Sequence, residues 1–217
     1  FYSCGSGTVL DHLVAYKGAD DGYEFFGGTV SATYLVSYGN YDDAFDWQDG
    51  WRGDANSNWY AYQTGKGNFG MEIEATNNNN AFGPKISKIT LKKAAGTTPE
   101  SDTDIQVDAF QFKREGNGEY NDIVIDGYGS YTVGTTVYQG AAVKIQDGNT
   151  NTNQVNTGKL KMTNVKIMNT AQTNPVGATN LISVSFPAGN FTTSEAAVGA
   201  TISNGNWSNV DGTNLVQ

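Results

Sequence analysis

Apolar and polar residues alternate in short segments that recur along the chain in a fixed order. Residues 13–16, Leu-Val-Ala-Tyr, precede an Asp-Asp pair and residues 22–26, Gly-Tyr-Glu-Phe-Phe, and the same order returns 22 residues later at 35–38 and 44–48. Alternation with a period of two predicts strands that have one buried and one solvated face. Each repeat therefore predicts two short strands, here called the first and the second strand of a coil.

Weaker copies of both strands follow along the chain. Further first strands are expected at 59–62, 89–91, 123–125 and 165–167, and further second strands at 70–74, 109–113, 142–146 and 181–186. A strand order that recurs coil after coil indicates a solenoid, because each turn stacks its strands on those of the turn before. We predict an all-β fold, a single-stranded parallel β-helix of about five to six coils over residues 1–186. Residues 187–217 are expected to be less regular and to form a candidate cap.

Corners and loops are expected between these strands. The residues that directly precede the first strands are His12, Tyr34, Asn58, Lys88, Asp122 and Asn164. Hydrogen-bonding side chains can stack at such a corner, and Asn58, Asp122 and Asn164 suit it best. The coils then lengthen, which predicts loops at 77–80, 96–103, 128–140 and 148–158, rich in Gly, Asn, Thr and Ser. Loops on a repetitive scaffold often carry binding sites.

The strongest repeats resemble a known family. Residues 20–30, Asp-Asp-Gly-Tyr-Glu-Phe-Phe-Gly-Gly-Thr-Val, followed by 42–47 and by Gly-Trp-Arg-Gly at 50–53, are similar to secreted right-handed parallel β-helix proteins. These proteins are common among surface lipoproteins of Bacteroidetes-type bacteria and belong to the pectin-lyase-like superfamily. The resemblance implies a right-handed β-helix that is secreted or lipoprotein-anchored in the outer membrane at the bacterial cell surface, without a defined activity. Such proteins usually have further upstream coils, so we expect this chain to be part of a longer chain or surface complex.

The charge balance excludes some partners. The chain has 22 acidic and 13 basic residues and a formal net charge of −9. This balance repels phosphate backbones, which argues against a nucleic-acid partner. No apolar stretch approaches the roughly 18 residues of a membrane span, so no direct span is expected. The single cysteine, Cys4, excludes an internal disulfide framework.

Carboxylates fall in register on successive coils. Glu24, Asp46 and Glu72 occupy equivalent places in adjacent second strands, which would stack them about 4.8 Å apart. Like charges at that spacing are unfavourable unless they are exposed, protonated or bridged by a cation. Oxygen ligands grouped in this way suit Ca²⁺. The alternative is that the Asp-Asp pairs form tight turns and accept hydrogen bonds from local backbone amides. The candidate Ca²⁺ ligands are Asp20, Asp21, Glu24, Asp42, Asp43, Asp46 and Glu72.

An enzymatic use of these carboxylates is an open alternative. Glycoside hydrolysis needs two carboxylates roughly 5 to 9.5 Å apart, and stacked repeats supply several such pairs by geometry alone. The Asn-Thr-Asp, Gly-His-Gly and Arg-Ile-Lys motifs of the β-helix polygalacturonases are absent. Arg52 and Arg114 are the only arginines, and Arg52 is expected to be a turn cation that pairs with nearby acids. His12, the sole histidine, sits at a corner position, which favours a structural role.

Aromatic residues suggest a binding surface. Trp51, Trp59, Tyr60 and Tyr62, together with Arg52, are candidate ligand-binding residues, because sugar rings stack on exposed aromatic faces. The leading hypothesis is a non-catalytic secreted or cell-surface module for adhesion or glycan binding, whose partner is a glycan or a surface protein. The alternatives are a polysaccharide lyase or glycoside hydrolase and a structural part of a larger surface assembly. An enzyme should bring a Lys or Arg and at least two acids together on one sheet face.

Overall fold

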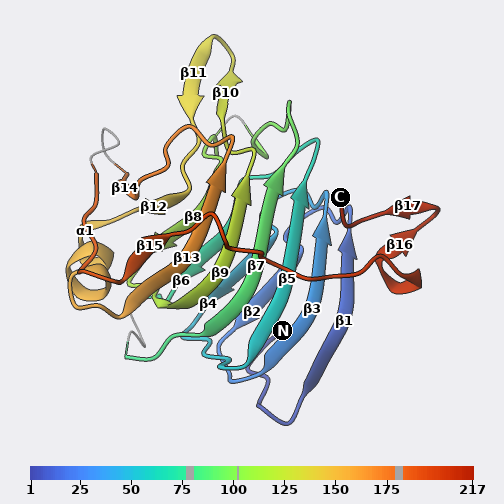
Figure 1. The fold of residues 1–217 in the computed structure, drawn as a ribbon, viewed down its shortest axis with the longest axis horizontal. Coiled ribbons are helices and arrows are strands. Elements are labelled where there is room, and N and C mark those ends of the chain that lie inside the picture. The colour runs from blue at the N-terminus through green and yellow to red at the C-terminus, as the bar shows by residue number, and fades with distance from the viewer. Residues whose placement is uncertain (77–80, 102, 179–182) are drawn as a thin grey trace.

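Two parallel sheets wind around a common core in the computed structural model, which describes residues 1–76, 81–101, 103–178 and 183–217 (Figure 1). The first sheet has the order β1 (Val9–Tyr16), β3 (Ser31–Tyr38), β5 (Asn56–Gln63), β7 (Lys85–Lys93), β9 (Gly118–Asp126), β13 (Leu160–Met168) and β15 (Phe191–Thr193). The second sheet has the order β2 (Tyr23–Phe26), β4 (Phe45–Gln48), β6 (Phe69–Glu74), β8 (Asp108–Lys113), β12 (Val143–Ile145) and β14 (Val176–Gly177). The prediction of an all-β parallel β-helix is confirmed.

Each long strand of the first sheet bends at the predicted corner. The six corner residues, His12, Tyr34, Asn58, Lys88, Asp122 and Asn164, all have φ between 54° and 59°. This left-handed conformation costs most residues roughly 1–2 kcal/mol, but Asn and Asp adopt it more readily. The corner turns the chain between two strand halves, so the predicted first strands are only the second halves of the observed ones. At the corner of β13, the Asn164 amide donates to the Asp122 carboxylate at 3.2 Å.

The core lies between the two sheets and is built from residues that repeat in register. Phe25, Trp47, Ile73 and Phe112 pair in sequence across the second sheet, and all are buried. Ring stacking adds contacts between coils, with Phe25 4.6 Å from Trp51, centroid to centroid. Apolar contact of this kind, repeated from coil to coil, supplies most of the energy that holds a solenoid together.

Several predicted segments differ in the structure. The sixth strand of the second sheet is the two-residue β14, not 181–186; residues 181 and 182 lie outside the described residues, and Ser183 makes an isolated bridge to Val176. The predicted loop 128–140 contains an antiparallel hairpin, β10 (Ser130–Val133) and β11 (Thr136–Gln139). The predicted loop 148–158 contains α1 (Gly148–Thr150) and a π-helical turn, η1 (Asn151–Val155). The predicted loop 77–80 lies outside the described residues, as does residue 102 of the loop 96–103.

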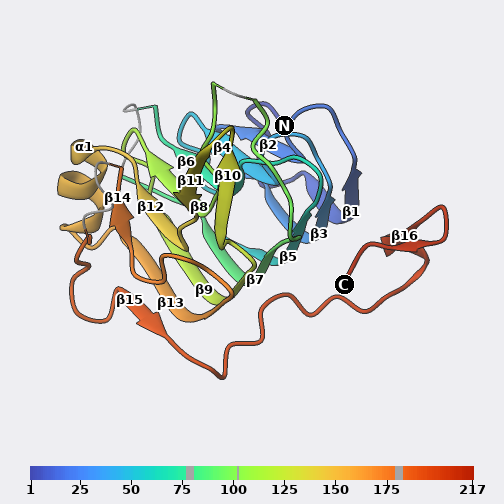
Figure 2. The same ribbon diagram turned by 90° about the horizontal axis from the view of Figure 1, so that it is seen from above.

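The C-terminal strap, residues 194–217, crosses the outer face of the first sheet (Figures 1 and 2). It leaves the sheet after β15 and runs back toward β1, where η2 (Asn206–Ser208) and the hairpin of β16 (Asn209–Val210) and β17 (Thr213–Asn214) follow. The corner residues hold it in place, because Asp122 Oδ1 accepts from the backbone N–H of Val198 at 2.8 Å and Asn58 Oδ1 from that of Thr201 at 3.0 Å.

A second apolar cluster lies beneath this strap. Val36, Tyr38 and Tyr60 point out of the first sheet, yet each is buried, together with Leu215 of the strap. Trp207 packs against the same cluster and against the His12 ring, whose centroid is 4.8 Å away. The outer face of β1, β3 and β5 is apolar. Its side chains are buried because the C-terminal strap covers them. No helix among the described residues is long and apolar enough to cross a membrane.

Candidate functional site

The predicted column of carboxylates is present on the second sheet. Glu24 pairs with Asp46, and Asp46 with Glu72, in adjacent strands. Carboxylate oxygens of Asp21, Glu24 and Asp46 lie within 4.8 Å of one another. The Gln48 amide donates to Glu24 at 3.0 Å, so part of this negative charge is already satisfied by the neighbouring coil.

The aspartates of the turns form a hydrogen-bonded ladder between coils. Asp21 Oδ1 accepts from the backbone N–H of Asp43 at 3.0 Å, and Asp43 Oδ1 accepts from that of Phe69 at 2.7 Å. Asp108 continues the pattern by accepting from the backbone N–H of Ala141 at 2.7 Å. Asp21 and Asp43 thus bond backbone amides, but not the local ones that the turn alternative predicted. The amides belong to the next coil rather than to the local turn, so the ladder fastens coil to coil.

A small residue follows each of these turns because the next coil packs closely against the chain there. A Cβ on Gly22 would lie 2.6 Å from the carbonyl oxygen of Ala44 in the next coil and would also collide with Ser37. Real Cβ atoms do not approach that closely, so this coil requires glycine.

Asp46 is the least satisfied member of the column. Its side chain is 6% exposed, and its Oδ1 is buried with no hydrogen-bond partner. Burial, followed by the charge of Glu72, raises the pKa of Asp46 to about 9. Burial likewise raises the pKa of Asp21 to about 7 and that of Asp42 to about 7. A carboxyl group in this state is either protonated at neutral pH or requires a cation.

A lysine meets two acids beside this column. Lys113 Nζ lies 2.7 Å from Glu72 Oε2 and 3.7 Å from Glu74 Oε2. Desolvation lowers the pKa of Lys113, but the charge and hydrogen bond of Glu72, together with the charges of Glu74 and Asp46, raise the pKa overall. Arg114 Nη1 reaches Glu74 Oε2 at 3.2 Å. The face thus holds the combination of a cation and at least two acids that an enzyme would need, and Lys113 was not among the predicted site residues. Its signal in the sequence is the Phe-Gln-Phe-Lys order of residues 110–113, which continues the second-strand pattern.

The predicted aromatic platform is wrong for three of its four aromatic residues. Trp51 and Trp59 are 1% and 0% exposed and lie in the core, where the indole N–H groups donate to the carbonyls of Val30 and Ala32. Tyr60 does face outward, but the strap covers it, and its hydroxyl donates to the carbonyl of Gln217 at 2.8 Å. Tyr62 is half-buried at the edge of the same cluster. Sugar stacking therefore has no exposed aromatic platform at these positions.

The prediction that Arg52 pairs with a nearby acid is wrong. Its side chain is exposed, and its guanidinium donates to the carbonyl of Gly50 at 3.4 Å. Within the part of the chain that the structure describes, no carboxylate lies within 4.0 Å of it.

A polar groove crosses the first sheet on a different face. It has a volume of about 520 Å³ and spans β5, β7, β9 and β13. Its centre is a register column of outward polar residues, Ser57, Ser87, Asn121 and Thr163. Sequence reasoning missed this column, although its signal is legible: the residue before each corner is polar in every coil.

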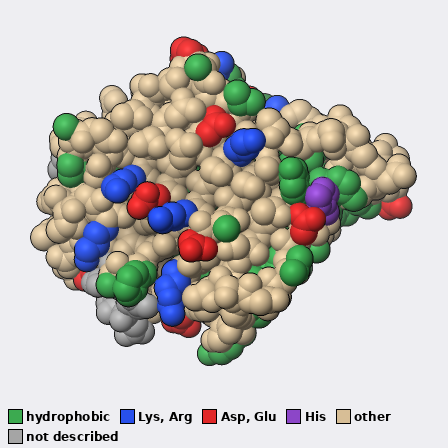
Figure 3. Space-filling model, turned by 60° about the horizontal axis from the view of Figure 1, so that its bottom comes forward, with side chains coloured by type: hydrophobic (Ala, Val, Ile, Leu, Met, Phe, Trp, Pro, Cys, Tyr) green, Lys and Arg blue, Asp and Glu red, His purple; other side chains and the backbone are tan. Residues whose placement is uncertain are grey.

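Lysines lie along one side of this groove. Lys85, Glu119 and Lys161 form a second register column two residues earlier in the strands. Lys161 Nζ is 3.7 Å from Glu119 Oε1, whereas no carboxylate among the described residues pairs with Lys85. Lys159 lies in an adjoining hollow that shares Lys85 and Lys161. Figure 3 shows basic side chains gathered on one side of this face and interleaved with carboxylates. The groove itself is lined by two lysines and two carboxylates, Asp54 and Glu119, and Lys159 of the adjoining hollow leaves a local excess of positive charge.

The fold and these surfaces define a parallel β-helix whose solvent-exposed outer faces are polar. The model of the pectate-lyase-like β-helix domain matches residues 1–210, nearly the whole chain. The chain therefore belongs to the pectate-lyase-like β-helix family, in agreement with the resemblance to the pectin-lyase-like superfamily. No curated protein and no solved structure matches it.

Proposed function

We propose that this chain is a non-catalytic β-helix module of a secreted or cell-surface protein that binds an oligosaccharide in the groove over β5, β7, β9 and β13. The observation that carries this proposal is the groove itself, a hollow of about 520 Å³ lined by a register column of hydroxyl and amide groups. Strand spacing of about 4.8 Å places these groups at regular intervals across four coils, which suits an extended ligand with repeating hydroxyls. The resemblance to surface proteins of Bacteroidetes-type bacteria supports the proposed location.

The lysines select the kind of oligosaccharide. Lys85 and Lys161 are accessible on one side of the groove, and together with Lys159 of the adjoining hollow they outnumber the two carboxylates of the lining, Asp54 and Glu119. A sugar that bears carboxylate or sulfate groups gains charge-assisted hydrogen bonds there that a neutral sugar does not. The proposed ligand is therefore an acidic oligosaccharide.

Affinity measurements on variants test this proposal. The double variant Lys85→Ala/Lys161→Ala should lose about tenfold or more in affinity for an acidic oligosaccharide, and its residual binding should depend less on salt. Lys88→Ala is the matched control, because Lys88 is exposed on the same strand but does not line the groove. Equal loss in both variants, or no binding by the unmodified chain to any acidic oligosaccharide of the panel, would contradict the proposal.

A second candidate function is cleavage of a polysaccharide on the second sheet. The specific observation in its favour is that Asp46, with its pKa raised to about 9, lies next to Glu72, whose carboxylate is held by Lys113 at 2.7 Å. One protonated and one ionised carboxyl group are the acid and the nucleophile or base of glycoside hydrolysis. Release of reducing ends from a polysaccharide panel, abolished by Asp46→Asn and unaffected by Glu195→Gln at an exposed position of the C-terminal strap, would support this function. Absence of product across the panel would exclude the cleavage function, and the binding module would remain as the proposed function.

A cation is the other way to satisfy Asp46. Asp21, Glu24 and Asp46 offer carboxylate oxygens within 4.8 Å of one another, and the unpartnered Asp46 Oδ1 is the observation that makes the group fit a hard cation such as Ca²⁺. We propose this site as a structural Ca²⁺ site. Thermal melts with Ca²⁺ and with EDTA decide the matter, since bound Ca²⁺ should raise the Tm of the unmodified chain but not that of Asp46→Asn. Identical melts in both conditions would exclude it.

A further inference from the structure

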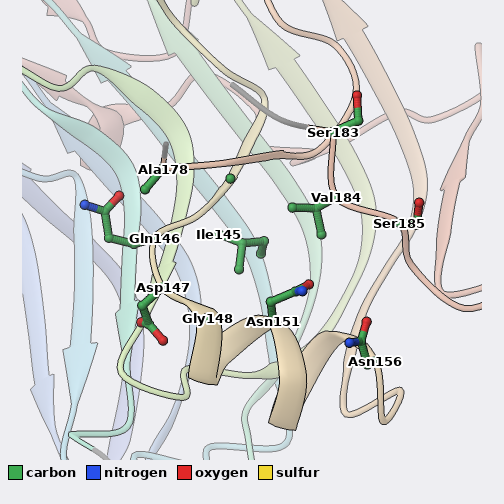
Figure 4. A pocket seen from close by; sticks show the side chains of 11 residues that line it. Ile145, Gln146, Asp147, Gly148, Asn151, Asn156, Ala178, Ser183, Val184 and Ser185 are labelled. Carbon is green, nitrogen blue, oxygen red and sulfur yellow. The ribbon is translucent and has the colours of Figure 1, made fainter. Parts of the chain in front are cut away.

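A pocket at the C-terminal end of the second sheet has no role in the proposed function. It has a volume of about 390 Å³ and lies between the end of β12, the α1–η1 segment and residues that follow β14 (Figure 4). Ile145, Ala178 and Val184 supply its apolar part. In Figure 4, Ile145 and Val184 lie near each other in the middle of the view, and Asn151 projects toward them from the helical segment. The volume is at the lower end of the range of about 300–1,000 Å³ for small-molecule pockets, which suits a ligand of one ring.

Unsatisfied polar atoms gather at this pocket. Among the described residues, four buried side-chain nitrogen or oxygen atoms have neither a hydrogen-bond nor an ion-pair partner, on Asp46, Asn68, Gln146 and Asn151. Two of these four residues, Gln146 and Asn151, line the pocket; in Figure 4 the Asn151 amide projects toward Ile145 and Val184, whereas the Gln146 side chain extends away from them. A buried amide oxygen without a donor costs roughly 1–3 kcal/mol, so such atoms in a pocket indicate a partner that supplies donors.

The charges around the pocket define the chemistry of that partner. Among the described residues, Asp147 is the only charged one that lines it, and both of its oxygens are occupied: Oδ1 accepts from Thr150 N at 2.8 Å and Oδ2 from Arg114 N at 2.7 Å. No lysine or arginine of the described part of the chain lines the pocket, so an acidic ligand would find no counter-charge from those residues. An apolar lining beside amide groups fits a ring that has C–H groups on its face and hydroxyl donors on its edge.

We propose that this end pocket binds a single neutral sugar residue, with the Asn151 amide oxygen accepting a hydrogen bond from one of its hydroxyls. The exposed hydroxyls of Ser183 and Ser185 at the pocket are placed for further hydrogen bonds with such a ligand. This site is separate from the groove of the first sheet, and its preference for a neutral ligand is opposite to that of the lysine-lined groove.

Ligand-observed NMR of the whole chain with neutral methyl hexosides and with free uronic acids tests the proposal. A neutral hexoside should bind, a uronic acid of the same ring should bind about tenfold more weakly or not at all at this site, and Asn151→Leu should reduce hexoside affinity by at least about tenfold. The melting temperature of Asn151→Leu should equal or exceed that of the unmodified chain, because the substitution removes an unpaired buried acceptor. Asn149→Leu is the matched control, since Asn149 is exposed on the adjacent helical turn and does not line the pocket.

The two binding-site proposals can be tested independently of each other. Lys85→Ala/Lys161→Ala should leave hexoside binding unchanged, and Asn151→Leu should leave binding of the acidic oligosaccharide unchanged. The end-pocket proposal is overturned if no hexoside of the panel binds, if Asn149→Leu weakens binding as much as Asn151→Leu does, or if the groove variant abolishes hexoside binding. A crystal structure showing only ordered waters on Asn151 in the presence of the hexoside would also overturn it.

Discussion

Asp43 accepts a hydrogen bond from the backbone N–H of Phe69 in the next coil, at 2.7 Å between Oδ1 and N. Asp43 is itself bonded through its backbone N–H to Asp21 of the preceding coil. Burial, followed by the charge of Glu72, raises the pKa of Asp43 well above its usual range. The turn looks local in the sequence, but its hydrogen bonds connect three successive coils.

Asp43→Ala should destabilise the chain by about 1–3 kcal/mol, because the buried Phe69 N–H is left without an acceptor. Asp43→Asn should retain most of the stability, since the amide keeps an acceptor oxygen in the same place and matches the carboxyl group in shape. Urea denaturation at pH 7 measures both. Equal losses in the two variants would show that the ladder bond does not carry the effect.

Stability should fall as the pH rises. Asp46 has a pKa of about 9 in the folded chain, and Asp21 and Asp42 have pKa values of about 7, against about 3.9 for an unfolded aspartate. Between pH 4 and these values the folded chain binds more protons than the unfolded chain, so each group can remove up to about 1.4 kcal/mol of unfolding free energy per pH unit. The groups that face Asp46 are Glu72, Asp21, Glu24 and Lys113.

Melts in EDTA from pH 4.5 to 9 measure this dependence. Asp46→Asn should flatten it, because the amide has no proton to lose, whereas Asp54→Asn on the exposed surface should not. A stability maximum at pH 8 or above in EDTA would contradict the prediction.

The C-terminal strap should loosen when its bond to Tyr60 is removed. The Tyr60 hydroxyl donates to the Gln217 carbonyl at 2.8 Å and accepts from the Gln217 N–H at 2.9 Å. Tyr60→Phe should cost about 1 kcal/mol and accelerate amide hydrogen exchange in residues 198–217, with little change in the core strands. Tyr62→Phe is the control, since its hydroxyl makes no hydrogen bond within the described part of the chain. Uniform acceleration over the whole chain would indicate that the strap is not a separate unit.

Lys88 is a test of the corner conformation. It is exposed and has a φ of 59°, which suits Gly or Asn better than Lys. Lys88→Gly should stabilise the chain by up to about 1 kcal/mol. The same change at Lys85, whose backbone is an ordinary strand, should destabilise it by roughly 0.5–1 kcal/mol. The melting temperatures of the two variants should therefore shift in opposite directions. Shifts of the same sign would contradict the corner conformation as the cause of the stabilisation.

The regular part of the fold is predictable from the sequence because it depends on local alternation and on a repeat. The small-apolar-polar-apolar order of the second strands placed Glu24, Asp46 and Glu72 in one column, and the structure confirms each of those pairings. The corner positions were also identifiable, although the left-handed φ that His12, Tyr34 and Lys88 share could not be read from residue types that seldom adopt it. The hairpin β10–β11 was missed because Gly- and Thr-rich segments read as loops.

The sequence by itself determined the order and the register of the coils, because each strand repeats its own pattern and a solenoid stacks like on like. Only the tertiary structure decided which outward residues meet solvent. Tyr60 reads as an exposed aromatic residue, yet it is buried, because a segment more than 130 residues away folds back over it and bonds to Asn58 and Tyr60. Contacts that depend on the path of the chain between repeats leave no periodic signal, and the cover over Tyr60 and the end pocket arise from such contacts.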